Sequence, residues 1–291
     1  MAKKKFGDRK DAKRVQLPGL MQCCIDLKPG RMENEVYINQ KMNVTPLVEY
    51  IEKKNAAGEH YTYFQAFATA IGKVIYNRPR LNQFITNRHL YAHNNVVLAF
   101  VAKMSLNDKS EELMLFIDVK PDDTIETIKE QISKKVANLR GEAEKVEKKG
   151  SNNAIDVLGK LPNILRVPLF GIIKIFDRHG WLPESLASTN IYYSSMIISN
   201  LGSIHCGAIY HNLANFGTCS GLASMGEIID TKVIRPDGTE EIQKQCEFGI
   251  TLDERIADGF YFAKSAKLVE YILMHPELLE EPASTKIEFE L

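Results

Sequence analysis

The chain has 291 residues, 44% of them hydrophobic, which is enough to bury the core of one large domain or two small ones. Its 37 basic and 37 acidic side chains give a net charge of zero. This balance excludes a dedicated nucleic-acid-binding protein, because such proteins are basic. No run of about 18 apolar residues is present, so no transmembrane helix is expected.

The cysteines and the N-terminal residues indicate the cellular compartment in which the protein is expected. Five cysteines occur without a regular framework, and no apolar signal segment begins the chain. Both features favour a reducing cytosol, so we expect a cytoplasmic protein. The His and Cys residues between positions 205 and 219 match no familiar zinc-ligand spacing, so no metal site is expected.

Residues 1–35 are expected to form a basic N-terminal arm, and residues 36–291 one domain. Basic side chains crowd the first fourteen positions, and we interpret them as solvent-exposed. They are Lys3, Lys4, Lys5, Arg9, Lys10, Lys13 and Arg14.

The first half of the domain alternates strands and helices. Residues 35–39 alternate in polarity and predict a strand, and Asn43 or Thr45 with Pro46 predicts the start of a helix. A second helix is expected from Thr62 to Pro79, with apolar side chains at spacings of three and four. Further strands are predicted at 82–85, 89–91, 96–102 and 113–119.

The middle of the chain combines a charged helix with an apolar insert at about 155–190. Residues 121–149 predict a long solvated helix that begins near Thr124. Residues 155–176 are unusually apolar but are interrupted by Pro162 and Pro168, so they are too broken to span a bilayer. Three interpretations stay open for this segment: a buried helical hairpin, a surface for a protein partner, or a helix lying on a membrane.

The last third predicts a strand, a turn-rich stretch, a hairpin and a helix. Residues 194–204 contain an apolar strand that ends at Ser199, and residues 205–221 are rich in turn formers. Residues 221–234 and 241–252 are expected to form a hairpin around the turn at 235–239. A final helix runs from Phe260 to His275, where Pro276 ends it. Together these elements predict an α+β fold with a mixed sheet and packed helices.

The loop between the hairpin and the last helix reads D-E-R-I-A-D-G from Asp253 to Gly259. It resembles the Asp-His-Arg-(apolar)-(apolar)-Asp-Gly signature shared by chloramphenicol acetyltransferase and the catalytic domain of the 2-oxo acid dehydrogenase acyltransferases. The histidine of that signature is replaced here by Glu254.

Four further segments resemble the same family in the same order, over about residues 36–282. They are residues 43–54, the helix that ends in N-R-P-R-L-N at 77–82, the strand I-I-S-N-L-G at 197–202, and the helix that ends in P-E-L-L at 276–279. The resemblance implies a CoA-dependent acyltransferase fold. No lipoyl domain or Ala/Pro-rich linker precedes the matching part, so no lipoyl attachment is expected.

The resemblance also implies a homotrimer with active sites at subunit interfaces, where acyl-CoA enters from one end and the acceptor from the other. Ser199 corresponds to the serine that donates a hydrogen bond to the oxyanion of the tetrahedral intermediate. Asp258 corresponds to the aspartate that holds the loop through an arginine, for which Arg14 and Arg31 are candidates. Glu254 takes the place of the histidine base.

Whether Glu254 acts as a base stays open at this point. An unperturbed glutamate has a pKa of about 4.3, against about 6.5 for histidine, so it needs burial or a neighbouring carboxylate such as Asp253 or Asp258. The alternatives are a structural loop residue, or a base supplied by His205 or His211. The leading hypothesis is an acyltransferase whose acceptor the sequence does not name. Its rival is a catalytically silent CoA-binding or scaffold protein with the same fold.

Overall fold

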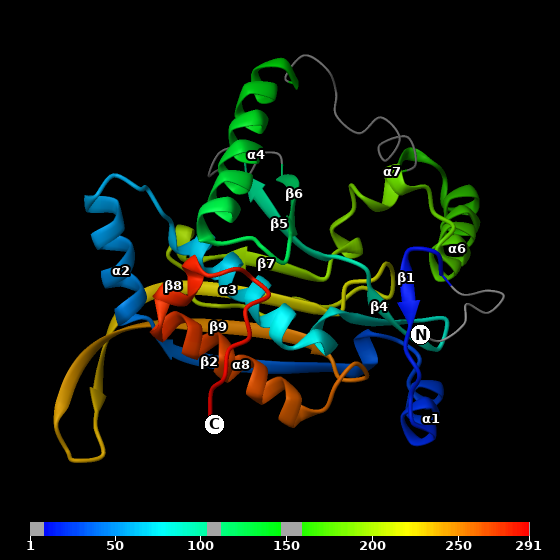
Figure 1. Cartoon of the computed structure of the whole chain (residues 1–291). Coiled ribbons are helices and arrows are strands. Elements are labelled where there is room, and N and C mark those ends of the chain that lie inside the picture. The colour runs from blue at the N-terminus through cyan, green and yellow to red at the C-terminus, as the bar shows by residue number, and fades with distance from the viewer. Residues whose placement is uncertain (1–8, 104–111, 147–158, 291) are drawn as a thin grey trace.

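The computed structural model describes residues 9–103, 112–146 and 159–290, and its α+β architecture contains two sheets (Figure 1). The six-stranded sheet has the order β2-β9-β8-β7-β5-β6, and the three-stranded sheet has the order β1-β4-β3. The large sheet is mixed, because β7 runs parallel to β5 and β8 while the other neighbours are antiparallel. The strands are β1 (Ala12–Arg14), β2 (Glu35–Asn43), β3 (Gln83–Thr86), β4 (His89–His93), β5 (Val96–Lys103), β6 (Glu112–Val119), β7 (Met196–Asn200), β8 (Gly221–Ile234) and β9 (Glu240–Asp253).

The helices begin where the sequence offers caps. The Thr62 side chain and Gln65 form a reciprocal capping box at the start of α3, and Asn43 Oδ1 accepts a hydrogen bond from Thr45 N at the start of α2. The α-helices are α1 (Gly19–Leu27), α2 (Thr45–Ala56), α3 (Tyr63–Asn77), α4 (Ile125–Val146), α6 (Asn163–His179), α7 (Glu184–Ala187) and α8 (Gly259–Met274). Short 3₁₀ turns are η1 (Met32–Asn34), η2 (Pro79–Asn82), η3 (Ile191–Tyr193), η4 (Gly202–Ile204) and η5 (Pro276–Glu280).

Both faces of the large sheet are covered. Helices α2, α3 and α8 lie on one face (Figure 1), where their apolar side chains join the main core. On the other face, Leu213 and Cys219 from the segment between β7 and β8 pack against Ala99, Ile197 and Leu222. Side chains therefore pack against both faces of the large sheet. The candidate site residues lie at or just beyond the ends of its strands.

The predicted hairpin is present and delivers the signature loop. Strands β8 and β9 pair over their length, with an irregularity between Met225 and Ile228, and the turn between them places Gly238 at φ +83°. Strand β9 ends at Asp253, and α8 begins at Gly259. The α+β class and the order of elements expected from the sequence are confirmed.

Two expectations are wrong in the described part of the chain. Arg9 is buried rather than solvated, because its guanidinium pairs with Asp11 and donates to the carbonyl of Asp177. The apolar insert is not a buried hairpin: α6 is a single helix with most of its large apolar side chains exposed, among them Ile164 and Val167. Residues 155–158 of the insert and residues 1–8 of the basic arm lie outside the described residues.

Candidate active site

The signature loop is a short connection between a buried strand end and a helix N-terminus. The Asp258 side chain caps α8 by accepting a hydrogen bond from Tyr261 N at 2.8 Å. Its other carboxylate oxygen lies 3.8 Å from Arg80 Nη1, and both side chains are well exposed. Asp258 therefore fixes the start of the helix, and its ion pair contributes little because solvent screens it.

The first aspartate of the loop, Asp253, is the anchor of this region. It has no exposed surface, and both of its carboxylate oxygens accept from Arg255: Nε at 2.8 Å and Nη2 at 2.7 Å. This two-bond geometry is the strongest arrangement that a guanidinium and a carboxylate can make. Arg255 also donates to the carbonyl of Pro29 at 2.6 Å, so the pair joins the loop to the chain that precedes β2.

Arg31 completes the buried cluster and connects it to a distant segment. Its Nε lies 3.8 Å from Asp253, and its other nitrogens donate to the carbonyls of Ile85, Ala214, Phe216 and Gly217. Burial lowers the pKa of Arg31 from its ordinary value, and the Asp253 carboxylate opposes that change. Of the two arginines considered as partners of Asp258, Arg31 pairs with Asp253 instead, and Arg14 lies beside His89 at 3.1 Å.

Glu254 points away from this cluster. Its side chain is 47% exposed, and its Oε1 lies 3.4 Å from the ammonium group of Lys28. Its backbone nitrogen donates to the carbonyl of Asn34 at 2.8 Å, which fixes the main chain but leaves the carboxylate at the surface. The burial that a base role for Glu254 would need is not found in the single chain.

Ser199 lies at the end of β7 in a different environment. Its Oγ is buried and makes no hydrogen bond within the described residues, and the same is true of Asn200 Oδ1 beside it. Both residues line a pocket of about 420 Å³ between β7, the η4 turn and the segment around His211. Buried hydroxyls are ordinarily paired, so an unpaired one facing a pocket is available to a ligand oxygen.

The two histidines near Ser199 in sequence are separated by the fold. His211 lines the same pocket as Ser199. His205 lies outside that pocket, on the surface, where its Nδ1 is 2.6 Å from Glu227. Only His211 of the two therefore shares a cavity with the serine.

Ser199 and Glu254 are not brought together in one chain. Ser199 is in register with Ser224, and Ser224 with Gly249, so Glu254 lies five residues further along β9. At about 3.4 Å per residue, this offset is about 17 Å along the strand, with two strand spacings in addition. A hydrogen bond chain between the two side chains within one subunit is excluded by this separation.

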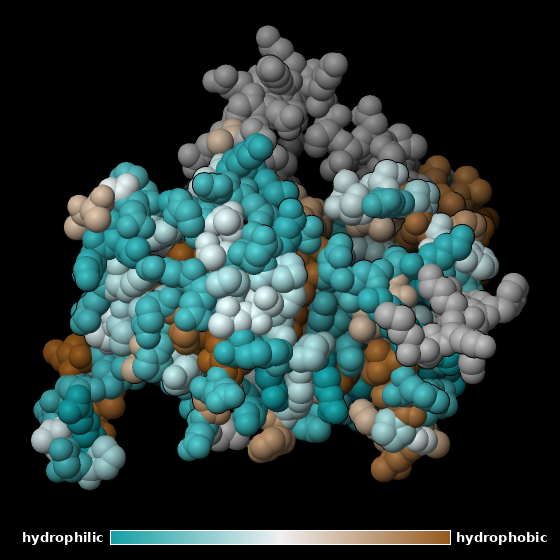
Figure 2. All heavy atoms as spheres, viewed as in Figure 1, coloured by the Kyte–Doolittle hydropathy of each residue, from teal (hydrophilic) through white to brown (hydrophobic). Residues whose placement is uncertain are grey.

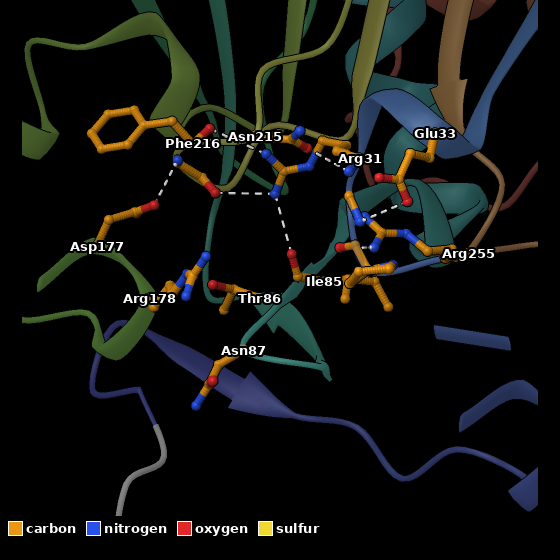
Figure 3. A pocket seen from close by; sticks show the side chains of 13 residues that line it. Arg31, Glu33, Ile85, Thr86, Asn87, Asp177, Arg178, Asn215, Phe216 and Arg255 are labelled. Atoms are coloured by element: carbon orange, nitrogen blue, oxygen red, sulfur yellow. Dashed lines mark hydrogen bonds between the residues drawn. The ribbon is translucent and has the colours of Figure 1, made fainter. Parts of the chain in front are cut away.

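A second pocket, of about 260 Å³, lies beside the buried cluster (Figure 3). Figure 3 shows Arg178 on one side of it and Glu33 on the other, with Arg31 between them. Asp177 is buried at its edge and accepts from Gly217 N at 3.0 Å and from Tyr193 Oη at 2.5 Å. Burial and this carboxylate raise the pKa of Tyr193.

The sequence interpretation missed Asp177. It is the single carboxylate between residues 159 and 183, and it directly follows the apolar run. A single carboxylate directly after an apolar run is the sequence feature by which Asp177 could have been singled out.

Comparison with known proteins gives matches in structure and none in sequence. No family model matches the chain, and no curated protein sequence matches it. Solved structures match it over nearly its whole length. The likeness to known proteins is therefore one of backbone arrangement.

Three of the similar structures are two acetyltransferases and the core of a multienzyme complex. The probable dihydrolipoamide acetyltransferase of Listeria monocytogenes is 15% identical, with a TM-score of 0.57 over 90% of this chain and 94% of that one. The cubic core of the pyruvate dehydrogenase multienzyme complex is 14% identical, with a TM-score of 0.59 over 92% and 93%. A chloramphenicol acetyltransferase is 12% identical, with a TM-score of 0.51 over 90% and 99%. The fold expected from the signature loop is confirmed.

Proposed function

We propose that this chain, which has the fold of chloramphenicol acetyltransferase and the dihydrolipoamide acetyltransferases, transfers an acyl group from acyl-CoA to a nucleophilic acceptor. The observation that supports it most is the Ser199 hydroxyl, which is buried and unpaired within the described residues and belongs to a residue that lines a pocket at the end of β7. A pre-placed donor of this kind stabilises negative charge that develops on a carbonyl oxygen.

Acyl transfer requires a base for the acceptor's proton and a hydrogen-bond donor for the oxyanion. Acyl-CoA and the acceptor are its only reactants. The acceptor's heteroatom attacks the thioester carbonyl carbon, and its proton passes to the base. The carbonyl oxygen becomes an oxyanion that accepts the Ser199 hydrogen bond. The intermediate then collapses, the carbon–sulfur bond breaks, and the CoA sulfur leaves with the proton. In this scheme CoA and acyl-CoA are substrates, and no metal or lipoyl group takes part.

We further propose that the working unit is a homotrimer with each site shared by two subunits. The separation of Ser199 and Glu254 in one chain supports this, because a site that uses both needs the second residue from a neighbour. Apolar side chains around Lys28 and Glu254 are also exposed in the single chain, namely Leu27, Met32 and Tyr37. Exposed apolar groups at one location are typical of a subunit contact.

Glu254 is the proposed base, and His211 is the competing one. Contact with a second subunit would remove Glu254 from solvent, whereas His211 already shares the Ser199 pocket in the single chain. The two possibilities give opposite outcomes in variants, so one experiment separates them.

The test is release of free thiol from acyl-CoA donors of several chain lengths with amine, hydroxyl and thiol acceptors. Loss of the donor in Ser199→Ala should lower kcat by ~10²–10³, and loss of the base in Glu254→Gln by ~10²–10⁴. The exposed residues Ser185 and Glu49 supply matched controls, Ser185→Ala and Glu49→Gln, which should act like the wild type. If His211→Asn is inactive while Glu254→Gln is active, His211 is the base.

Mixing two inactive variants tests the shared site. Trimers assembled from equal amounts of Ser199→Ala and Glu254→Gln chains have both intact residues at roughly one interface in four, so about a quarter of the activity should return. No recovery would refute a site that combines Ser199 of one chain with Glu254 of its neighbour. If no variant or wild-type protein releases thiol but acyl-CoA still raises the melting temperature, the chain is the catalytically silent binding protein. If acyl-CoA does neither, the proposal is wrong.

The free cysteines support a cytoplasmic location as part of this proposal. Cys23, Cys24 and Cys206 are exposed and unbridged. Exposed thiols persist in a reducing compartment, where CoA thioesters are also chemically compatible with the surroundings.

A further inference from the structure

Helix α6 is attached to the protein through polar groups near its C-terminal end. Asp177 is buried there, where it accepts from Gly217 N and Tyr193 Oη, and its carbonyl accepts from Arg9. Helices on the surface of a soluble protein ordinarily contact the core through their apolar face. In α6 the one fully buried side chain is Asp177, and most of the large apolar side chains are exposed.

The outward face is a continuous apolar arc. At 100° per residue, about one third of the helix circumference carries the exposed apolar residues Ile164, Leu165, Pro168, Ile172, Ile175 and Phe176. Leu169 and Ile173 at its edge are half-buried, and Val167 and Phe170 are exposed outside it. Ile164 is 82% exposed, Leu165 58% and Ile172 53%. Figure 2 shows these apolar side chains gathered over α6 at the upper right of the molecule. Trp181, 55% exposed, extends the surface just beyond the helix, where it stacks on His179.

The exposed charges of α6 and of its immediate flanks are basic, and the nearest exposed carboxylates beyond them are Asp11 and Glu184. Between residues 159 and 183 the charged side chains that reach solvent are Lys160, Arg166, Lys174 and Arg178, and the single carboxylate, Asp177, is buried. An apolar helix surface with basic side chains around it is complementary to a partner that offers both an apolar layer and negative charges.

Two other occupants fit the helix less well. A contact between the α6 helices of two copies would bring like charges together, which costs free energy. Contact of α6 with a different face of a neighbouring copy is the alternative that the test below distinguishes. Residues 147–158 of the same chain contain only Ala154, Ile155, Val157 and Leu158 as apolar residues, too few to cover the arc. Nor does any helix in the described ranges have the length and apolarity that crossing a bilayer demands.

We propose that α6 binds an anionic lipid surface, lying parallel to it with its apolar arc among the acyl chains and its cations at the headgroups. A strongly amphipathic helix with Lys and Arg on one side and Phe, Ile and Leu on the other is suited to this position. Trp181 lies at the boundary between apolar and polar layers, where indole rings are favoured. This binding is independent of the acyl-transfer proposal.

The test is flotation of the full chain with vesicles of phosphatidylcholine alone or mixed equally with phosphatidylglycerol. We expect the chain to float with the anionic vesicles and to stay behind with the neutral ones. Leu165→Glu/Ile172→Glu should weaken binding by at least ~100-fold. Lys174→Gln should weaken it about fivefold, with an effect that fades at high salt.

A matched control uses the β8–β9 hairpin, where Ile234 and Ile242 are also largely exposed. Ile234→Glu/Ile242→Glu should float like the wild type. All substituted side chains are exposed, so circular dichroism and melting temperature should be unchanged. Equal flotation of the α6 variant and the wild type, or equal binding to both vesicle types, would overturn the proposal. So would a change of oligomeric state in the α6 variant without lipid, because α6 would then be a subunit contact.

Discussion

Replacing Asp253 by asparagine removes the carboxylate that pairs with the buried Arg255 and Arg31 guanidiniums. The carboxylate makes two hydrogen bonds of 2.7 and 2.8 Å to Arg255 and lies 3.8 Å from Arg31 Nε. Removal of one partner from a buried ion pair costs about 3–5 kcal/mol, because the remaining charge stays buried without compensation. For a chain of this length, about 2 °C is lost per kcal/mol, so the melting temperature should fall by about 6–10 °C.

The assay is urea unfolding followed by circular dichroism, at one fixed protein concentration, with scanning calorimetry for the melting temperature. The matched control is Asp230→Asn, which breaks an ion pair to Lys244 on the surface of the hairpin. That pair is exposed and screened by solvent, so its loss should change little. If Asp253→Asn and Asp230→Asn unfold at the same urea midpoint, the buried cluster does not hold the signature loop and the reasoning is refuted.

Three further predictions concern single residues. Ser199→Ala should leave the free energy of unfolding unchanged or raise it by up to ~1 kcal/mol, since the hydroxyl is buried without a partner in the described residues. Ser224→Ala removes hydrogen bonds to the backbone of Ile209 and should cost about 1–2 kcal/mol. Urea unfolding of the two variants distinguishes these outcomes. Burial lowers the pKa of His93 to about 4, so the unfolded state binds more protons than the folded state below pH 6.5. The free energy of unfolding should therefore fall by about 3 kcal/mol between pH 6.5 and pH 4. The His93→Gln variant should lack this pH-dependent loss of stability. Gly217→Ala should cost about 2–4 kcal/mol, because φ is +73° and the added Cβ meets the Tyr192 carbonyl; calorimetry would show an unshifted melting temperature if this is wrong.

Local sequence signals determined most of the elements. The alternation of β2, the capping box at Thr62, the prolines that end α3 and α8, and the turn at 235–239 each act over a few residues. Short-range patterns of this kind are set by backbone sterics and by local hydrogen bonds, which the sequence displays directly. The motif around Gly259 and the segments that accompany it indicate the fold from the sequence.

The environment of each candidate site residue was decided by the tertiary structure. Sequence places Glu254 between two aspartates, but the fold turns Asp253 toward Arg255 and Arg31 and leaves Glu254 beside Lys28 at the surface. It places His205 and His211 equally near Ser199, but only His211 shares its pocket. Directions of neighbouring side chains alternate along a strand and diverge in a loop, so adjacency in sequence does not predict contact.

By itself, then, the sequence determined the order of strands and helices, the signature loop and the unusual apolarity of residues 155–176. Only the tertiary structure decided that Arg9 and Asp177 are buried together and that α6 therefore shows its apolar face to the outside. The physical reason is that helical periodicity defines two faces without saying which one is inward. That choice depends on which partners the rest of the chain offers, and here Gly217, Tyr193 and Arg9 offer polar ones.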